Sequence, residues 1–175
     1  MDAEKLVRLI KNRYRKPGCL FHFTDERNIP SIAANGLLSN AERKKANIDD
    51  VITGGNEWSH TQDVRKGLTD YVHLCFFDKH PMEYIAKREE RLNDTYFIKV
   101  LPEILKRDGV KFCAGVSNSR DSVLFGFEDF EDHVDMKALF RRMEWKDPEE
   151  LARVRLTEKY EILIPKRVPK TFLRK

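Results

Sequence analysis

Two polar side chains near the beginning of the sequence are spaced so that they could bind one ligand. Segment 19–24 is apolar enough to predict a short buried strand, in which alternate side chains share a face. Phe21 and Phe23 are then expected to pack inward, while His22 and Thr24 share the other face and offer hydrogen-bonding groups. A single histidine near the end of a strand is more often structural, so this pair alone is a weak signal.

Glu161 is the second candidate, because it is a carboxylate inside an otherwise apolar segment. A buried carboxylate is costly unless it is paired or functional. Strand alternation places Ile162 and Ile164 on one face, and Glu161 with Leu163 on the other. If the face of Glu161 lines a cleft, the residue is positioned to act as a catalytic carboxylate. A surface glutamate on an edge strand is the alternative.

A metal site is not expected. His60, His73 and His80 match no zinc-binding spacing, and no HExxH or CxxC motif occurs. The three cysteines are odd in number, widely spaced and set in apolar contexts, which predicts buried thiols.

The region between Gly115 and Arg155 combines small polar residues, aromatics and arginines. Bases stack on aromatic rings and arginines bind phosphates, so this region could recognise a nucleic-acid substrate. For Phe140 and Trp145 we favour a role as core anchors of a helix.

The elements that must position these residues follow from hydrophobic periodicity and from proline and glycine stops. We expect strands at about 19–24, 71–77, 95–101, 110–113 and 159–165, and helices at about 3–13, 28–36, 81–91, 101–107, 134–145 and 148–156. Asn28 is expected to cap the second helix. Polar segment 39–69 predicts a long functional loop with one helical turn. The interspersed but irregular order predicts one α+β domain over residues 1–175, with a mixed or antiparallel sheet flanked by helices.

Composition and charge limit the classes of protein further. The sequence has 175 residues, of which 41% are hydrophobic and 35% charged, and no apolar run approaches the length of a membrane span. The N-terminal residues lack the apolar stretch of a signal peptide, so we expect a cytoplasmic protein without a membrane partner. The last ten residues carry five cations and no anion, which is compatible either with nucleic-acid binding or with a merely solvated end.

Four motifs in order give a more specific indication. They read HFTxxxNIPSIxxxGLLS, YVxLxFxxxxPMxY, GVxFxxxxSN and EILIPxxVP, and the matching segments are 22–39, 71–84, 109–118 and 134–168. This pattern resembles the DarT family of NAD-dependent DNA ADP-ribosyltransferases over nearly the whole chain.

The resemblance implies a compact ADP-ribosyltransferase fold with NAD in a cleft between two small sheets. His22 and Thr24 match the NAD-contacting pair of the family, and Tyr71 and Met82 in the second motif are expected to bind NAD as well. Glu161 matches the catalytic glutamate. Such a carboxylate would stabilise positive charge as the nicotinamide–ribose bond breaks, and would remove a proton from the attacking base.

The family commonly has a functional arginine in the loop before the YVxLxF strand. Arg65 is the nearest candidate here, and His60 or Ser59 is the alternative at that position.

Members of the family modify a base in single-stranded DNA and are often paired with a macrodomain antitoxin that removes the mark. The expected function is therefore that of a toxin or anti-phage enzyme, with NAD as co-substrate, no metal, and single-stranded DNA as partner. The cations expected to hold DNA phosphates are Arg153, Arg155, Lys166 and Arg167. An NAD-dependent RNA enzyme (an RNA ADP-ribosyltransferase or a tRNA 2′-phosphotransferase) and a non-catalytic nucleic-acid-binding module are the alternatives.

Overall fold

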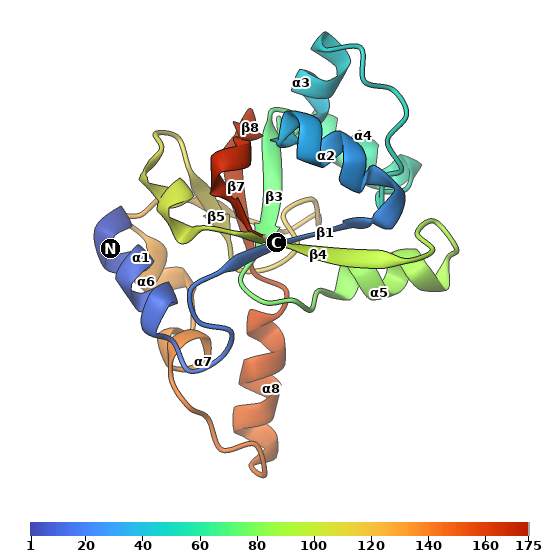
Figure 1. Ribbon diagram of the computed structural model, residues 1–175. Helices are drawn as coiled ribbons and strands as arrows, with labels where there is room; N and C mark the ends of the chain where they lie inside the picture. Colours follow the sequence, from blue (N-terminus) through green and yellow to red (C-terminus); the bar gives the residue numbers. More distant parts are fainter. Residues whose placement is uncertain (175) are drawn as a thin grey trace.

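A seven-stranded antiparallel sheet forms the centre of the molecule (Figure 1). The structure is a computed structural model and describes residues 1–174. The strand order is β6-β5-β7-β3-β1-β4-β9, and β2 and β8 form a separate two-stranded ladder. The strands are β1 (Leu20–Asp25), β2 (Leu37–Leu38), β3 (Tyr71–Cys75), β4 (Thr95–Val100), β5 (Lys111–Cys113), β6 (Leu124–Phe125), β7 (Glu161–Pro165), β8 (Arg167–Val168) and β9 (Leu173–Arg174).

Helices flank this sheet, and α1, α2, α5 and α8 begin within one residue of the predicted positions. The helices are α1 (Ala3–Asn12), α2 (Ile29–Asn35), α3 (Asn40–Lys45), α4 (Glu57–Arg65), α5 (Pro81–Arg88), α6 (Phe130–His133), α7 (Met136–Phe140) and α8 (Pro148–Thr157). Short 3₁₀ turns cover Glu26–Asn28, Pro102–Lys106 and Lys170–Phe172. Asp2 caps α1 through Lys5 N, and Pro81 and Pro148 each occupy the first turn of a helix, where the missing N–H costs nothing.

Several segments differ from the prediction. The two-residue strands β2, β6, β8 and β9 were not expected, and the expected helix 101–107 is a 3₁₀ turn. The expected loop 39–69 contains both α3 and α4, which begin at side-chain caps: Ser39 accepts from Glu42 N, and Asn56 accepts from Ser59 N. These helices escaped prediction because they bury few side chains and so lack apolar periodicity. The expected helix 134–145 is realised only as α7, because the chain is extended at Asp135 and again at Arg141; α6 precedes this segment and was not expected.

Trp145 was predicted as a core anchor, and this prediction is wrong. It follows the end of α7 and is 69% exposed, with Lys146 over its ring, whereas Phe140 is buried as expected.

The sheet consists of two well-paired halves that diverge between β1 and β3. Six residue pairs join β1 to β4 and five join β3 to β7, but the only pair between β1 and β3 is Phe21 with Cys75. Beyond that pair, the contact of His22 Nδ1 with the His73 carbonyl, at 2.8 Å, bridges the two strands. The expected arrangement of two small sheets is thus realised as two halves of one sheet, with the β2–β8 ladder beside them.

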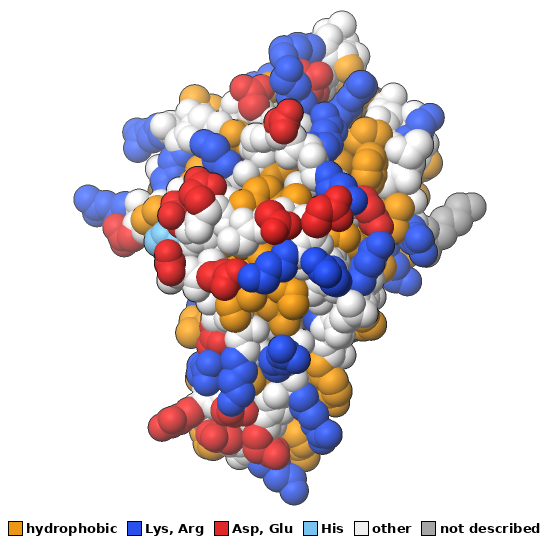
Figure 2. Space-filling view, turned by 90° about the vertical axis from the view of Figure 1, so that its left-hand side faces the viewer, with side chains coloured by type: hydrophobic (Ala, Val, Ile, Leu, Met, Phe, Trp, Pro, Cys, Tyr) orange, Lys and Arg blue, Asp and Glu red, His pale blue; other side chains and the backbone are white. Residues whose placement is uncertain are grey.

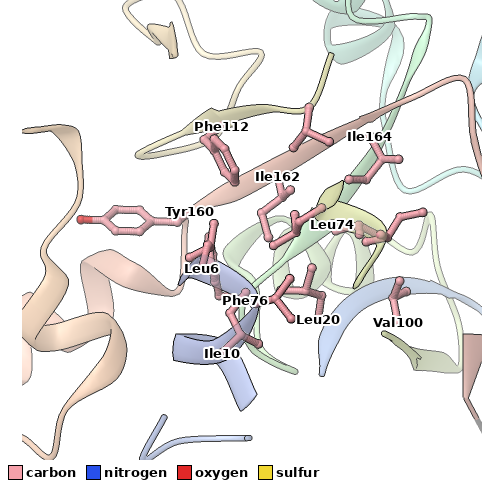
Figure 3. Close-up of a cluster of buried hydrophobic side chains, with 14 of the residues drawn as sticks. Leu6, Ile10, Leu20, Leu74, Phe76, Val100, Phe112, Tyr160, Ile162 and Ile164 are labelled. Atoms are coloured by element: carbon pink, nitrogen blue, oxygen red, sulfur yellow. The ribbon is translucent and has the colours of Figure 1, made fainter. Parts of the chain in front are cut away.

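One face of the strands β3, β5 and β7 supplies the hydrophobic core. Ile162 pairs with Leu74 on one side and with Phe112 on the other, and all three side chains are buried. Leu6 and Ile10 of α1 complete this cluster (Figure 3). Because alternate residues of β7 point to opposite faces, burial of Ile162 turns Glu161 toward the other side of the sheet.

Charges are mixed on the face of the molecule drawn in Figure 2, where positive and negative side chains are interspersed. Among residues 1–174, no helix combines the length and apolar character that a membrane crossing requires.

We predict that Gly36 is essential to the turn between α2 and β2, since φ is +80° and an added Cβ would lie 2.4 Å from the Val168 carbonyl oxygen of β8. Gly18 is a matched control, because its φ is +78° but a Cβ there meets nothing within 4 Å. We expect Gly18→Ala to lower the free energy of unfolding by about 1–2 kcal/mol through backbone strain alone, and Gly36→Ala to cost about 1–3 kcal/mol more from the clash. Urea unfolding measures both; equal losses would contradict the close approach.

Candidate active site

A cavity of about 230 Å³ lies beside the point where the two halves of the sheet diverge. Its walls come from β1, α2, α3, segment 48–55, α4, β3 and β7. The structure brings to this cavity five of the six residues expected to be catalytic or to bind NAD: His22, Thr24, Tyr71, Met82 and Glu161.

Glu161 is the first residue of β7, and strands on both sides fix its position. It pairs with Cys75 of β3 and with Cys113 of β5, and its exposed fraction is 7%. The interpretation of Glu161 as a surface residue on an edge strand is therefore excluded, since β7 is an inner strand.

One oxygen of the Glu161 carboxylate, Oε2, is held by three contacts. Ser117 donates from its backbone N at 3.2 Å and from its hydroxyl at 2.5 Å, and His73 Nδ1 lies 3.1 Å away. Lys66 in turn donates to the Ser117 carbonyl at 3.3 Å, which helps to hold that segment in place. Ser117 lies in the region expected to recognise substrate, but its contact with Glu161 links two segments that are far apart in sequence, and no spacing rule could have found it.

These contacts keep the carboxylate ionised. Burial by itself would raise the pKa of Glu161, but the hydrogen bond and charge of His73, together with the Ser117 hydroxyl, outweigh burial, so the pKa lies below its usual value. For His73, burial acts to lower the pKa, and Glu161 reverses this effect, so the pKa is raised. A buried but ionised carboxylate at a cavity wall is an arrangement that catalysis often uses.

Thr24 and Asn28 fasten segment 48–55 to β1. Asn28 Nδ2 donates to the Thr24 hydroxyl at 3.0 Å and to the Ile52 carbonyl at 2.7 Å, and Asn28 Oδ1 accepts from Ile52 N at 3.0 Å. Asn28 occupies the N-cap position of α2, as expected, but its side chain makes no capping bond and bridges these segments instead.

His22 is a neutral donor and acceptor in the wall of the cavity. His22 Nδ1 donates to the His73 carbonyl, which leaves Nε2 as an acceptor, and burial lowers the pKa of His22. Phe23 was expected in the core, but it is half-buried, lines the cavity and stacks on His80 with ring centroids 5.7 Å apart.

The sequence analysis missed Arg43, which lines the cavity from α3. Its Nε atom is buried and has no hydrogen-bond partner among residues 1–174, and burial lowers the pKa of the guanidinium. Arg65, by contrast, is exposed in the last turn of α4 and is absent from the cavity wall, so the structure does not support its assignment to the site. The alternatives Ser59 and His60 both line the cavity, with His60 Nε2 at 3.2 Å from the Thr53 hydroxyl.

A dinucleotide fits the chemistry of this wall. The Arg43 Nε donor suits a pyrophosphate, and Asp63 Oδ1, buried without a partner in the described chain, could accept from a sugar hydroxyl. Apolar side chains such as Ile32 and Val51 line the same cavity and could cover a ring. No cluster of three or more His, Cys, Asp or Glu side chains able to hold a metal occurs within residues 1–174.

The four cations expected to bind DNA do not form one surface. Lys166 and Arg167 are exposed at the β7–β8 connection, close enough to α3 to influence Glu42. Arg153 and Arg155 lie on α8, at the opposite end of the molecule from α2, α3 and α4 (Figure 1). Arg153 is also bound by Asp135, with contacts of 2.6 and 2.9 Å, so its guanidinium connects α8 to the cap of α7 and is not free for a phosphate.

Comparison with known proteins gives the family. Residues 21–175 match the family model described as "ssDNA thymidine ADP-ribosyltransferase, DarT". No curated protein sequence matches.

Solved structures of DarT proteins share the fold. A DarT from Thermus sp. 2.9 in complex with ADP-ribosylated single-stranded DNA has a TM-score of 0.61 at 19% identity, over 93% of this chain and 82% of that one. The same protein in complex with NAD+ has a TM-score of 0.56 at 18% identity, over 92% and 81%. DarTG from Thermosipho africanus in complex with ADP-ribose has a TM-score of 0.62 at 20% identity; the alignment covers 89% of this chain but only 42% of that one.

The fold is that of the solved DarT structures. The chain belongs to the DarT family, which is a family of NAD-dependent ADP-ribosyltransferases acting on single-stranded DNA. The predicted family, fold class and type of enzyme are therefore confirmed.

We predict that the two cysteines flanking Glu161 are unreactive in the folded protein. Burial, followed by the negative charge of Glu161, raises the pKa of both thiols, that of Cys113 to about 11. At pH 8 we expect iodoacetamide to modify Cys19, which is half-buried, at least on the order of 10²-fold faster than Cys75 or Cys113. Mass spectrometry of the alkylated peptides measures this, with urea-unfolded protein as the control. Equal rates in the native state would contradict the environment described for Glu161.

Proposed function

We propose that this chain transfers ADP-ribose from NAD+ to thymidine in single-stranded DNA, with Glu161 as the catalytic residue. The observation that carries the proposal is the buried, ionised Glu161 carboxylate in the wall of the cavity, one oxygen of which, Oε2, is fixed by three contacts while the other, Oε1, has no short hydrogen bond. The family description supports thymidine as the acceptor.

Bound NAD+ supplies an electrophilic ribose carbon and a nicotinamide leaving group. Glu161 is placed to accept a hydrogen bond from a ribose hydroxyl and so to stabilise positive charge that develops on the sugar. The same carboxylate can take the proton from the attacking base, which removes the need for a second acidic residue.

The remaining residues of the cavity bind and orient the co-substrate. Arg43 is the group best suited to the pyrophosphate, because its Nε donor is buried without another partner in the described chain. His22 and Thr24 offer hydrogen bonds on the β1 side, while Tyr71 and Met82 supply apolar contact surface.

The DNA strand reaches this cavity with its target base unstacked, which favours single strands over duplex. Lys166 and Arg167 are the cations best placed to hold its backbone, since they are exposed near α3, whose Arg43 lines the cavity. Arg155 is exposed but distant, on α8.

A toxin role and an antitoxin partner are part of the same proposal. The Thermosipho africanus neighbour is named DarTG and was solved with ADP-ribose, which supports a partner able to remove the modification; we take this partner to be a macrodomain. DNA as substrate favours action in the cytoplasm.

The test of this function is Glu161→Gln, which preserves the shape of the side chain and removes its charge. We expect transfer of labelled ADP-ribose to a thymidine-containing oligonucleotide to fall by a factor on the order of 10²–10³ or more. Folding and NAD+ affinity should change little, because the charge acts mainly on the transition state. Oligonucleotides without thymidine and the corresponding RNA serve as controls. Near-normal transfer by the variant, or preferential labelling of RNA by the wild type, would contradict the proposal.

A second prediction compares the two candidate arginines. We expect Arg43→Ala to raise KM for NAD+ on the order of tenfold or more, since a bidentate or charge-assisted contact to phosphate is lost. Arg65→Ala should have the smaller effect, because its side chain is exposed outside the cavity. Steady-state kinetics of both variants show which arginine binds NAD+. A larger effect at Arg65 than at Arg43 would favour the assignment made from the sequence.

A further inference from the structure

The two oxygens of Glu161 have unlike surroundings. All three contacts from Ser117 and His73 go to Oε2. The other oxygen, Oε1, has His80 Nε2 at 3.5 Å, which is longer than an ordinary N–H···O bond, and that nitrogen has no hydrogen-bond partner in the described chain. The carboxylate is therefore anchored through one atom and available through the other.

His80 is fixed as a neutral imidazole, and this leaves His73 as the charged partner. The Nδ1 atom of His80 accepts a hydrogen bond from Met82 N at the beginning of α5, so its proton must sit on Nε2, facing Glu161. Burial, in addition, lowers the pKa of His80.

His73 lies on β3 two residues before Cys75, the partner of Glu161, and thus on the same face of the sheet as the carboxylate. Its ring faces two carboxylates, Glu161 from β7 and Asp63 from α4. The Leu68 carbonyl acts in the same direction, favouring the protonated ring.

Other titratable groups surround these carboxylates: the thiols of Cys75 and Cys113 beside Glu161, His60 near Asp63, and three more cationic or imidazole side chains. His22 on β1 contacts the His73 backbone and is kept neutral by burial. His80, at the beginning of α5, opposes a charge on His73 only weakly because it too is neutral. Lys66, after α4, is directed to the segment Ser117–Ser122.

We propose that His73 is a positioning residue of the reaction: as an imidazolium it holds Oε2 of Glu161 together with Ser117, so that Oε1 is presented to the substrate. This inference rests on the proposed catalytic role of Glu161. It assigns a role to a position that the motif YVxLxF leaves open. The active form of the pair has His73 protonated and Glu161 ionised, and activity is lost when either condition fails.

The pH dependence follows from these two protonation states. The pKa of His73 is raised above its ordinary value of 6.5, so the imidazolium is present below that raised pKa and disappears as pH rises through it. The pKa of Glu161 is lowered, so its charge persists to more acidic pH than usual. The alkaline fall in kcat is therefore assigned to His73.

His73→Gln tests the role in catalysis, and His133→Gln is the matched control, since His133 is exposed and stacks on Phe125 outside the cavity. We expect His73→Gln to lower kcat by about 10- to 100-fold because the Glu161 carboxylate is misplaced, with KM for NAD+ little changed. The wild type and His133→Gln should both lose kcat as the pH rises, and His73→Gln should not show this loss. An unchanged kcat, or an unchanged pH profile, would overturn the proposal.

A second measurement does not depend on activity. NMR of the protein with ¹⁵N-labelled histidine should show His73 titrating above pH 6.5 in the wild type, and its midpoint should fall by about one unit or more in Glu161→Gln. A midpoint below 6.5, or one that does not respond to Glu161, would overturn the pairing. If the wild type transfers no ADP-ribose to any nucleic acid, the proposed function fails, while the titration still decides whether the two side chains are coupled.

Discussion

A carboxylate buried in an apolar strand must regain from the protein the stabilisation that it loses with its hydration shell. For Glu161 that stabilisation comes from Ser117 and His73, which contact a single oxygen. The surrounding strands and helix hold Glu161 in the position where these contacts form. Strands β3 and β5 hold β7 from both sides, and α1 covers the opposite face of the sheet, where Ile162 is buried. Because α1 buries Ile162 on one face of β7, strand alternation places Glu161 on the other face, toward the cavity.

The divergence of β1 from β3 is the second constraint, because it opens space next to Glu161 without breaking the sheet. A single residue pair joins the two strands. Beyond it, the His22 side chain, and not the backbone, makes the hydrogen bond from β1 to β3, at the His73 carbonyl. Asn28 links segment 48–55 to β1, so this segment forms one wall of the cavity. The cavity is thus bounded by an ordinary antiparallel sheet on one side and by short capped helices on the other.

Local signals predicted the five longer strands, whose apolar runs and alternation are strong, but not the two-residue strands β2, β6, β8 and β9. Alternation alone placed Glu161 and Ile162 on opposite faces of β7. Ordered motifs identified the family, which no single residue could do. Arg43 could not be found in this way: it lies in the charged run Glu42–Lys45, which reads as a solvated helix face, and only the fold directs it into a cavity. The same limit applies to Arg153, whose partner Asp135 is 18 residues away. Trp145 was predicted to be buried because its side chain is apolar. It is exposed because α7 ends at Phe140, so Trp145 does not lie on a helix face that packs against the core.

We propose that one cavity brings the ribose of NAD+ to Oε1 of Glu161, which Ser117 and His73 anchor through Oε2. A crystal structure of the wild-type protein with a non-hydrolysable NAD+ analogue tests this placement most directly. The account predicts the nicotinamide ribose within hydrogen-bond distance of Oε1, the pyrophosphate at Arg43, and Oε2 still bound by Ser117 and His73. Density for the analogue outside this cavity, or a ribose bound with Glu161 turned away from it, would contradict the account.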